Sequence, residues 1–338
     1  MYKRLLAVLC LLWVPALLWA RPCFRLTVLN VGQGLSAVAE SPDGKVLVFD
    51  CGSESGGFES KNGNRTARYL RQRGRRRIDL LILSHPDADH SSGIVELARE
   101  FTIGSFLSPD VPGPAMTDVR KELRRRHTPC GTLRAGQSFR LGKEVVCRAV
   151  AGGTSTETNS GSAAVLLSVG DTGFLLTADM GKREEYAMCS RFGSALRADV
   201  LLAPHHGSAG SCSETLLRTV RPKLLVISCG ADNKYGHPAP ETLKRASELR
   251  VPWLVTCQKG DIILISDGKR AGLLRQDEEQ LRRFLKRPHA AYLPPSSLPN
   301  NPSFPSSSES FFHMLPMALP KAGKAFSVMV LSMFWLSL

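Results

Sequence analysis

The sequence predicts an α/β (α+β) protein built as an αββα sandwich, in which two mixed sheets pack face to face and helices cover their outer faces. Short runs rich in Val, Leu and Ile alternate with glycine and proline turns from residue 24 to residue 269. These strands fall into two groups, and each group ends in helices. The hydrophobic fraction of 43% is ordinary for a globular protein, which excludes a largely disordered chain.

The first group begins with three strands that are separated by turn residues such as Gly32, Pro42 and Gly44. A helix and a fourth strand follow, and two more helices come after a polar loop. The expected strands are residues 26–31, 37–40, 46–49 and 79–83, and the expected helices are residues 65–73, 94–101 and 118–126.

The second group has longer apolar runs and only two expected helices, residues 184–192 and 240–249. The expected strands are residues 138–141, 145–150, 163–169, 173–177, 199–203, 224–228, 253–256 and 262–266.

Four side chains that bind metal ions lie within six positions, directly after the fourth strand of the first group. They are His85, Asp87, Asp89 and His90. Imidazole nitrogen and carboxylate oxygen are ligands of Zn²⁺ and Mn²⁺, and a tight loop can turn two of them toward each of two neighbouring ions. A chance cluster is the alternative, because Asp and His are individually common in loops.

Two strands of the second group deliver further ligands at their ends. One ends at Asp179, whose carboxylate can bridge two cations about 3.5–4 Å apart. The other leads to the adjacent pair His205 and His206. Adjacent strand residues point to opposite faces, so we expect one of the pair to bind metal and the other to face substrate or a hydrogen-bonding partner. Ligands at three strand ends favour a metal centre.

The first 20 residues predict export. Lys3 and Arg4 precede an apolar stretch with small residues near its end, as in a secretory signal peptide; an N-terminal membrane anchor is the alternative. We expect a periplasmic or secreted protein, with any membrane association through this segment. In an oxidising compartment, the eight cysteines from Cys23 to Cys257 permit disulfides, and we expect one to three.

The rest of the chain divides into a folded domain at residues 24–275 and a tail at residues 276–338. The tail is basic and then rich in Pro and Ser, which predicts disorder, and its apolar end is too short to span a bilayer. The net charge of +14 is concentrated in two basic runs, at residues 65–77 and 120–126. Such runs attract DNA or anionic lipid, although solvated helix faces are the alternative.

Ordered motifs in residues 24–270 resemble one known family. The loop from His85 to His90 has the pattern HxDxDH, and residues 159–162 have the pattern N-x-x-S. Other motifs are LNVGQG at 29–34, FDCG at 49–52, TAD at 177–179, PHHGS at 204–208 and YGHP at 235–238. Together they resemble the metallo-β-lactamase superfamily, specifically the hydrolase domain of ComEC-type DNA-uptake (competence) proteins.

The resemblance implies a metal-dependent hydrolase with two divalent ions, Zn²⁺ in the first place and Mn²⁺ as the alternative. The ligands of one ion would be His85, Asp87 and Asp179, and those of the other Asp89, His90, Asp179 and either His205 or His206. The separate middle histidine ligand of the superfamily has no equivalent here, and Leu202 stands where many relatives carry Lys. One metal position is therefore expected to be more open.

Further residues are candidates for catalysis and substrate binding. Asp89 would orient the attacking water, and His237 would contact phosphate or donate a proton. A turn histidine packed against Pro238 is the alternative for His237. Asn159 and Ser162 would donate hydrogen bonds to phosphate, or else cap an adjoining helix or strand.

The expected activity is that of a phosphodiesterase or nuclease acting on DNA. Hydrolysis of another exported ester, such as a phosphocholine ester or a lactone, is the second hypothesis. The third is a catalytically weak binding module that accompanies a DNA-uptake machine.

Overall fold

The computed structural model describes residues 23–53, 64–153 and 159–274, which belong to one compact unit, Pro22–His313. The predicted signal or anchor at residues 1–20 and the predicted tail at residues 276–338 lie outside the described residues. Within the described ranges, no helix is both long enough and apolar enough to cross a membrane.

The first sheet has eight strands, which include both ends of the folded unit. They are β1 (Phe24–Val28), β2 (Ala37–Glu40), β3 (Val46–Phe49), β5 (Leu80–Ile82), β7 (Phe106–Ser108), β8 (Cys130–Thr132), β16 (Ile262–Ser266) and β17 (Ala271–Leu273). Their order is β17-β16-β1-β2-β3-β5-β7-β8, and the last four run parallel to one another. Two short strands, β4 (Arg77–Ile78) and β6 (Thr102–Ile103), form a separate pair.

The second sheet has seven strands and is also mixed. They are β9 (Ser138–Leu141), β10 (Val145–Ala151), β11 (Ala164–Val169), β12 (Thr172–Leu176), β13 (Val200–Leu202), β14 (Leu224–Ile227) and β15 (Trp253–Val255). Strands β12 to β15 are parallel and follow one another across the sheet. Parallel neighbours need crossover connections, and helices supply them here.

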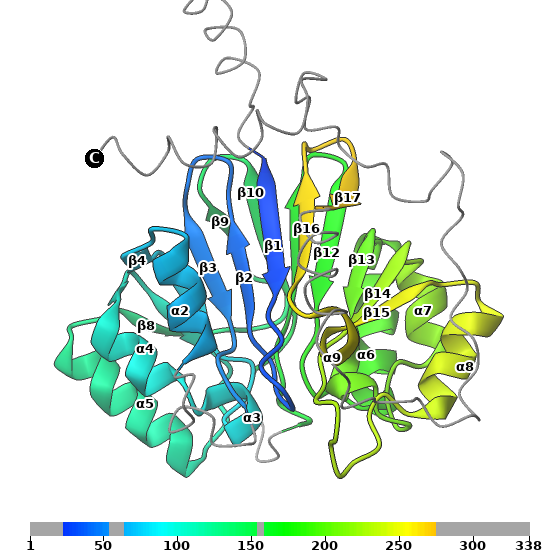
Figure 1. Ribbon diagram of the computed structural model, residues 1–338, viewed down its shortest axis with the longest axis horizontal. Coiled ribbons are helices and arrows are strands. Elements are labelled where there is room, and N and C mark those ends of the chain that lie inside the picture. The colour runs from blue at the N-terminus through cyan, green and yellow to red at the C-terminus, as the bar shows by residue number, and fades with distance from the viewer. Residues whose placement is uncertain (1–22, 54–63, 154–158, 275–338) are drawn as a thin grey trace, which may run out of the picture. The chain divides into compact units, whose positions relative to one another are not determined.

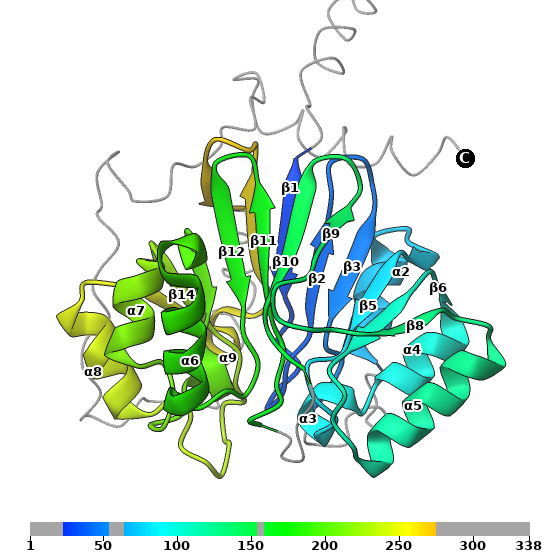
Figure 2. The same ribbon diagram turned by 180° about the vertical axis from the view of Figure 1, so that it is seen from behind.

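Helices cover the outer face of each sheet. The first sheet carries α2 (Arg65–Gln72), α4 (Ile94–Glu100) and α5 (Pro114–Arg125), with the short α3 (Ala88–Ser91) at its edge. The second carries α6 (Lys182–Phe192), α7 (Glu214–Val220) and α8 (Pro240–Glu248), and α9 (Thr256–Lys259) follows β15. Figures 1 and 2 show the four layers from opposite sides. The predicted αββα sandwich is confirmed.

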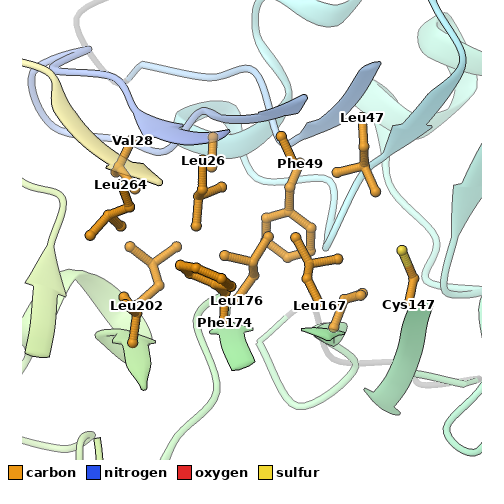
Figure 3. Close-up of a cluster of buried hydrophobic side chains, with 14 of the residues drawn as sticks. Leu26, Val28, Leu47, Phe49, Cys147, Leu167, Phe174, Leu176, Leu202 and Leu264 are labelled. Carbon is orange, nitrogen blue, oxygen red and sulfur yellow. The ribbon is translucent and has the colours of Figure 1, made fainter. Parts of the chain in front are cut away.

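The apolar inner faces of the two sheets form a common core. Phe49 and Leu26 of the first sheet face Leu176 and Phe174 of the second (Figure 3). The rings of Phe24 and Phe174 lie 4.9 Å apart between centroids. Burial of each such side chain contributes about 1.5–3 kcal/mol, so the inner faces are the main source of cohesion between the sheets.

Most elements lie within two residues of their expected bounds, but several short ones were not expected. Strands β7, β8 and β17 have three residues each, and α7 has seven. Segments this short show no periodic pattern that distinguishes them from loops.

The expectation of one to three disulfides is wrong for this structure, because the eight cysteines from Cys23 to Cys257 are free thiols. Five of them are buried. Cys147 lies in the core between the sheets, where burial raises the pKa of its thiol to about 12. The thiols of Cys229 and Cys257 hydrogen-bond each other at the ends of the paired strands β14 and β15. The buried cysteines pack as small apolar residues.

Candidate metal centre

The candidate ligands meet at the edge of the sandwich where the parallel strands end. Strand β5 leads to His85 and α3, β12 leads to Asp179, and β13 leads to the turn Pro204–Gly207. In Figure 1, β12 ends toward the lower edge of the sandwich, the edge at which α3 also lies. Parallel strands of one sheet end at the same edge, and the packing of the two sheets brings the end of β5 next to the ends of β12 and β13. His90 and His206, 116 positions apart, thereby become neighbours.

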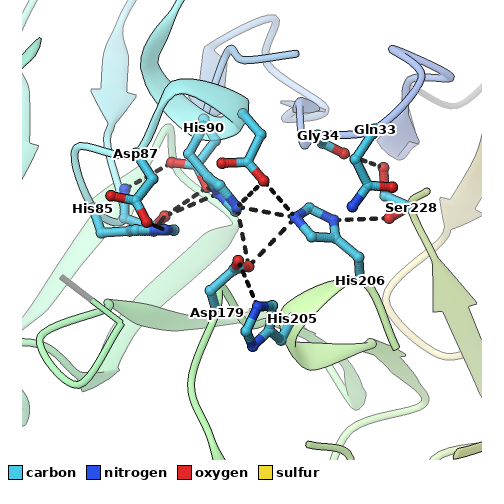
Figure 4. A network of polar contacts seen from close by, with 12 residues as sticks. Gln33, Gly34, His85, Asp87, His90, Asp179, His205, His206 and Ser228 are labelled. Carbon is cyan, nitrogen blue, oxygen red and sulfur yellow. Dashed lines mark hydrogen bonds and ion pairs between the residues drawn. The ribbon is translucent and has the colours of Figure 1, made fainter. Parts of the chain in front are cut away.

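Four of the predicted ligands form one cluster. A ligand atom of each of Asp89, His90, Asp179 and His206 lies within 4.8 Å of the others. The Nε2 atom of His90 is 3.0 Å from Asp179 Oδ1 and 3.3 Å from His206 Nε2. His206 Nε2 is in turn 3.2 Å from Asp89 Oδ2. Figure 4 shows His90, Asp179 and His206 pointing toward one another.

These separations fit a common metal ion. Ligands bound at about 2.0–2.1 Å in a tetrahedron lie about 3.3 Å from one another. The four atoms are 3.0 to 4.0 Å apart in the contacts among them. Two imidazoles and two carboxylates are a donor set that suits Zn²⁺ and also admits Mn²⁺.

His90 is oriented by Asp50, at the end of β3. The Nδ1 group of His90 donates to Asp50 Oδ2 at 2.8 Å, so that its Nε2 faces the cluster. Asp50 also accepts from the backbone N–H and the hydroxyl of Ser84, each at 2.7 Å. A carboxylate behind a histidine fixes the ring and raises its basicity. Asp50 therefore braces the metal loop from behind.

His206 is oriented in the same way from the second sheet. Its Nδ1 group donates to the carbonyl of Ser228 at 2.9 Å, which leaves the Nε2 lone pair toward the cluster. The Ser228 hydroxyl donates to the carbonyl of Gly34 at 2.8 Å. This chain of contacts links the two sheets behind the site.

The two histidines after β13 do not alternate as strand residues, which corrects the argument from strand geometry. Strand β13 ends at Leu202, and both His205 (φ 49°) and His206 (φ 53°) have left-handed backbone conformations in a tight turn. His206 is buried in the cluster. His205 Nε2 lies 3.6 Å from the other oxygen of Asp179, and its side chain is 35% exposed.

His85 and Asp87 lie beside this cluster and not within it. The His85 Nε2 is 3.5 Å from Asp87 Oδ2, and the ring centroids of His85 and His90 are 4.1 Å apart. His85 Nε2 is buried and accepts no hydrogen bond among the described residues. A buried, unsatisfied nitrogen next to carboxylates fits a second ion. Asp87 is 42% exposed, so this position is more open to solvent.

The charges of the cluster favour a bound cation. Burial alone would raise the pKa of Asp179, but the imidazoles of His90 and His206 outweigh it and hold this pKa well below its usual range. Burial alone would lower the pKa of His90, but the carboxylates of Asp179 and Asp50 hold this pKa well above its usual value. These carboxylates therefore hold a positive charge in a buried site, and a metal ion can take the place of the proton.

His237 lies next to the cluster but is not part of it. Its ring is 5.8 Å from that of His205 and 6.3 Å from that of His206, between centroids. Burial, followed by repulsion from these two histidines, lowers the pKa of His237 to about 4. The ring is therefore neutral at pH 7.

Asn159 and Ser162 form a turn before β11 and beside the metal loop. The Ser162 N–H donates to the carbonyl of Asn159 at 3.1 Å, and the Ala163 N–H donates to the carbonyl of Ser84 at 3.0 Å. Ser162 is buried, whereas Asn159 is half-buried. Their predicted contact with phosphate stays a prediction.

Gly34 and Gly52, each the last residue of a sequence motif, allow the backbone of α3 to approach closely. A Cβ on Gly52 would overlap the backbone of Asp89 and His90, and one on Gly34 would lie 2.7 Å from the Asp89 carbonyl oxygen. The neighbouring N–H groups of Leu35 and Cys51 donate to the Asp89 and His90 carbonyls, both at 2.9 Å. In the sequence, the signal for this packing was the glycine that ends each of the motifs at 29–34 and 49–52.

A family model for the metallo-β-lactamase superfamily matches residues 29–231, which is more than half of the chain. The chain belongs to the metallo-β-lactamase superfamily. Its solved relative YhfI from Bacillus subtilis, itself a metallo-β-lactamase fold protein, is 15% identical with a TM-score of 0.50. The alignment covers 72% of this chain and 100% of that one, and it confirms the fold alone.

Within the superfamily, the chain is similar to competence proteins, as its motifs predicted. It is 27% identical over 269 residues to ComE operon protein 3 of Bacillus subtilis, which covers 74% of this chain and 34% of that protein. It is 28% identical to competence protein ComA of Neisseria gonorrhoeae, and the match covers 65% of this chain and 29% of that protein. Recombination protein 2 of Haemophilus influenzae is 30% identical, and the match covers 67% of this chain and 27% of that protein. The chain thus spans about a third of the length of these relatives or less.

Most arginines of the first basic run, residues 65–77, form ion pairs with carboxylates of the same domain. Five of its seven arginines contact Glu40, Asp79, Glu100 or Asp261; they are Arg65, Arg71, Arg73, Arg75 and Arg77. The single carboxylate of Glu40 accepts hydrogen bonds from both Arg73 and Arg75. Much of this charge therefore stabilises the fold, and its availability to a polyanion is reduced.

Proposed function

We propose that this protein is an exported, metal-dependent phosphodiesterase that cleaves DNA. The observation that carries the proposal is the buried cluster of Asp89, His90, Asp179 and His206 in a chain similar to competence proteins. The superfamily and the donor set support a metal-dependent hydrolase. DNA as the substrate, a diester bond as the target and export are parts of the proposal.

Two divalent ions would be held at the shared edge of the sheets. Asp89, His90, Asp179 and His206 would hold one, and His85, Asp87 and Asp179 the other. When bound, such ions make water a nucleophile at neutral pH and offset the charge of a phosphate.

The chain's own residues would position the reactants. Asp89 is the half-buried carboxylate of the cluster, and it would accept a hydrogen bond from the attacking water. The low pKa of His237 keeps its ring uncharged at pH 7, and the one N–H of the neutral ring would donate a hydrogen bond to a phosphate oxygen. Asn159 and Ser162 would contact the phosphate from the turn before β11.

The test is a hydrolysis assay with the purified full chain, supplied with Zn²⁺ or Mn²⁺. The substrates are single-stranded DNA, a small phosphodiester, a phosphocholine ester and a lactone. We expect cleavage of DNA and the diester, with a loss of at least about 100-fold in Asp89→Asn and Asp179→Asn. Asp118→Asn, an exposed residue of α5, is the matched control.

Two other outcomes would contradict the proposal, and each would favour a different alternative. Turnover of the phosphocholine ester or the lactone, with DNA left intact, would favour hydrolysis of another exported ester. Stoichiometric metal binding without any hydrolysis would favour the binding module. Export is tested separately, by locating the protein in cell fractions and measuring the mass of its mature amino terminus.

A further inference from the structure

The loop between β14 and α8 carries an exposed aromatic ring that is connected to the metal centre through other rings. Tyr235 is 51% exposed, and Tyr186 on α6 is the other exposed large hydrophobic residue in the described chain. The ring of Tyr235 is stacked on that of His237, with a centroid distance of 5.5 Å and an interplanar angle of 21°. His237 is in turn nearly parallel to His206, at 6.3 Å and 26°.

These three rings form a series that leads from the buried cluster to solvent. His206 is buried, His237 is half-buried and Tyr235 is exposed. The series therefore places an aromatic ring at the rim of the site, two ring steps from a candidate metal ligand. A DNA strand bound with one phosphate at the cluster would carry its neighbouring nucleotides past this rim.

The loop is held in this position by hydrogen bonds of its own. The Asn233 side chain accepts from the N–H of His237 at 2.8 Å and donates to the carbonyl of His237 at 2.6 Å and to that of Gly230 at 2.8 Å. The Ala239 N–H donates to the carbonyl of Gly207, directly after the cluster histidine. Tyr235 is thus presented by a braced loop.

A positive charge accompanies the ring. The Lys234 ammonium lies 4.9 Å from the centroid of Tyr235. An aromatic face next to a cation is the arrangement that binds single-stranded nucleic acid, because the base stacks and the phosphate contacts the cation. Bases in a duplex are already stacked on one another and are less available to such a ring.

From this geometry we infer that Tyr235 and Lys234 form a subsite for one nucleotide of single-stranded DNA, next to the scissile phosphate. The inference rests on the proposed function and extends it to a preference for single strands. Tyr235 would stack on the base, and Lys234 would contact the adjoining phosphate.

The first experiment measures binding of a fluorescent single-stranded oligonucleotide to the full chain in a chelator, which separates binding from turnover. We expect Tyr235→Ala to weaken binding about tenfold and Tyr235→Phe to bind like wild type, because the face and not the hydroxyl stacks. Tyr186→Ala is the matched control and should bind like wild type. An oligonucleotide without bases should bind wild type and Tyr235→Ala equally weakly.

A second measurement tests the role of Lys234. Lys234→Ala should weaken binding and lower the slope of log affinity against log salt by about 0.7, the value for one phosphate of a single strand. Equal binding of Tyr235→Ala and wild type, or tighter binding of duplex than of single-stranded DNA, would overturn the inference.

Turnover distinguishes failure of the inference from failure of the proposed function. In wild type that cleaves DNA, Tyr235→Ala should raise KM about tenfold while kcat changes little. Cleavage by wild type with an unchanged KM in Tyr235→Ala overturns the inference alone. A wild type that neither binds nor cleaves DNA overturns both.

Discussion

Asp50 Oδ2 lies 2.8 Å from Nδ1 of His90, and both residues are fully buried. This contact ties the end of β3 to the metal loop after β5, and it turns the opposite nitrogen of His90 toward Asp179, His206 and Asp89. The orientation of one ligand is therefore set by a residue outside the cluster.

The first prediction concerns this contact. Asp50→Asn should lower metal affinity about 10- to 100-fold, because the ring of His90 loses the carboxylate that orients it. Competition with a chromophoric chelator measures the affinity. Asp118→Asn should leave it unchanged, and the idea fails if Asp50→Asn binds metal as tightly as wild type.

The second prediction distinguishes the adjacent histidines. His206→Ala should lose about one metal ion per chain, because its Nε2 lies 3.2 Å from Asp89 and 3.3 Å from His90. His205→Ala should retain more metal, since its ring is partly exposed and its Nε2 lies 3.6 Å from Asp179 Oδ2, farther than the contacts of His206 with Asp89 and His90. Elemental analysis of the dialysed proteins gives the content, and the reverse order would contradict the assignment.

The third prediction concerns the close approach at Gly52. Gly52→Ala should lower the free energy of unfolding by about 1–3 kcal/mol and weaken metal binding, because a Cβ would displace the backbone of Asp89 and His90. Gly210 has no atom closer than 4.0 Å to a Cβ position, so Gly210→Ala is the control. Chemical denaturation measures stability; equal effects of the two substitutions would refute the packing argument.

The fourth prediction concerns the pH dependence of stability. Burial would raise the pKa of Glu40, but Arg73 and Arg75 outweigh it and lower this pKa from its usual value of 4.5. A lowered folded-state pKa stabilises the protein above about pH 4.5, and this stabilisation is lost as the pH falls through the folded-state pKa.

Glu40→Gln should therefore cost about 2 kcal/mol at pH 7, since three arginines would lose their carboxylate, and less near pH 3. Denaturation curves at the two pH values measure the difference. Glu144→Gln, an exposed residue, should have no effect at either pH. A cost that does not depend on pH would show that the carboxylate's charge is not responsible.

The fold could be predicted from sequence because strong apolar runs and turn residues mark its strands. Strands at Ala37–Glu40, Val46–Phe49 and Ile262–Ser266 have their expected bounds. By contrast, β7 and β8 are three residues long and pair only through the parallel register of the first sheet. The hydrogen bonds that create such strands come from neighbours distant in the sequence, which no local pattern encodes.

The residue types of the site were also predictable, because His85 to His90, Asp179 and the pair at 205–206 follow apolar strands. The sequence did not predict which histidine of the pair joins the cluster. Both lie in a left-handed turn, and the direction of each ring depends on contacts with Ser228 and Asp179. The disulfide expectation failed for a related reason: cysteine count gives neither separation nor burial.

The sequence by itself determined the layered class of the fold, the superfamily and the set of side chains able to bind metal, because these follow from periodicity and from motifs along the chain. Tertiary structure alone decided that Asp50 orients His90, that Glu40 neutralises part of a basic run, and that Tyr235 stands at the rim of the site. The physical reason is that each of these depends on the distance between atoms from different strands and loops, which only the packing of the two sheets sets.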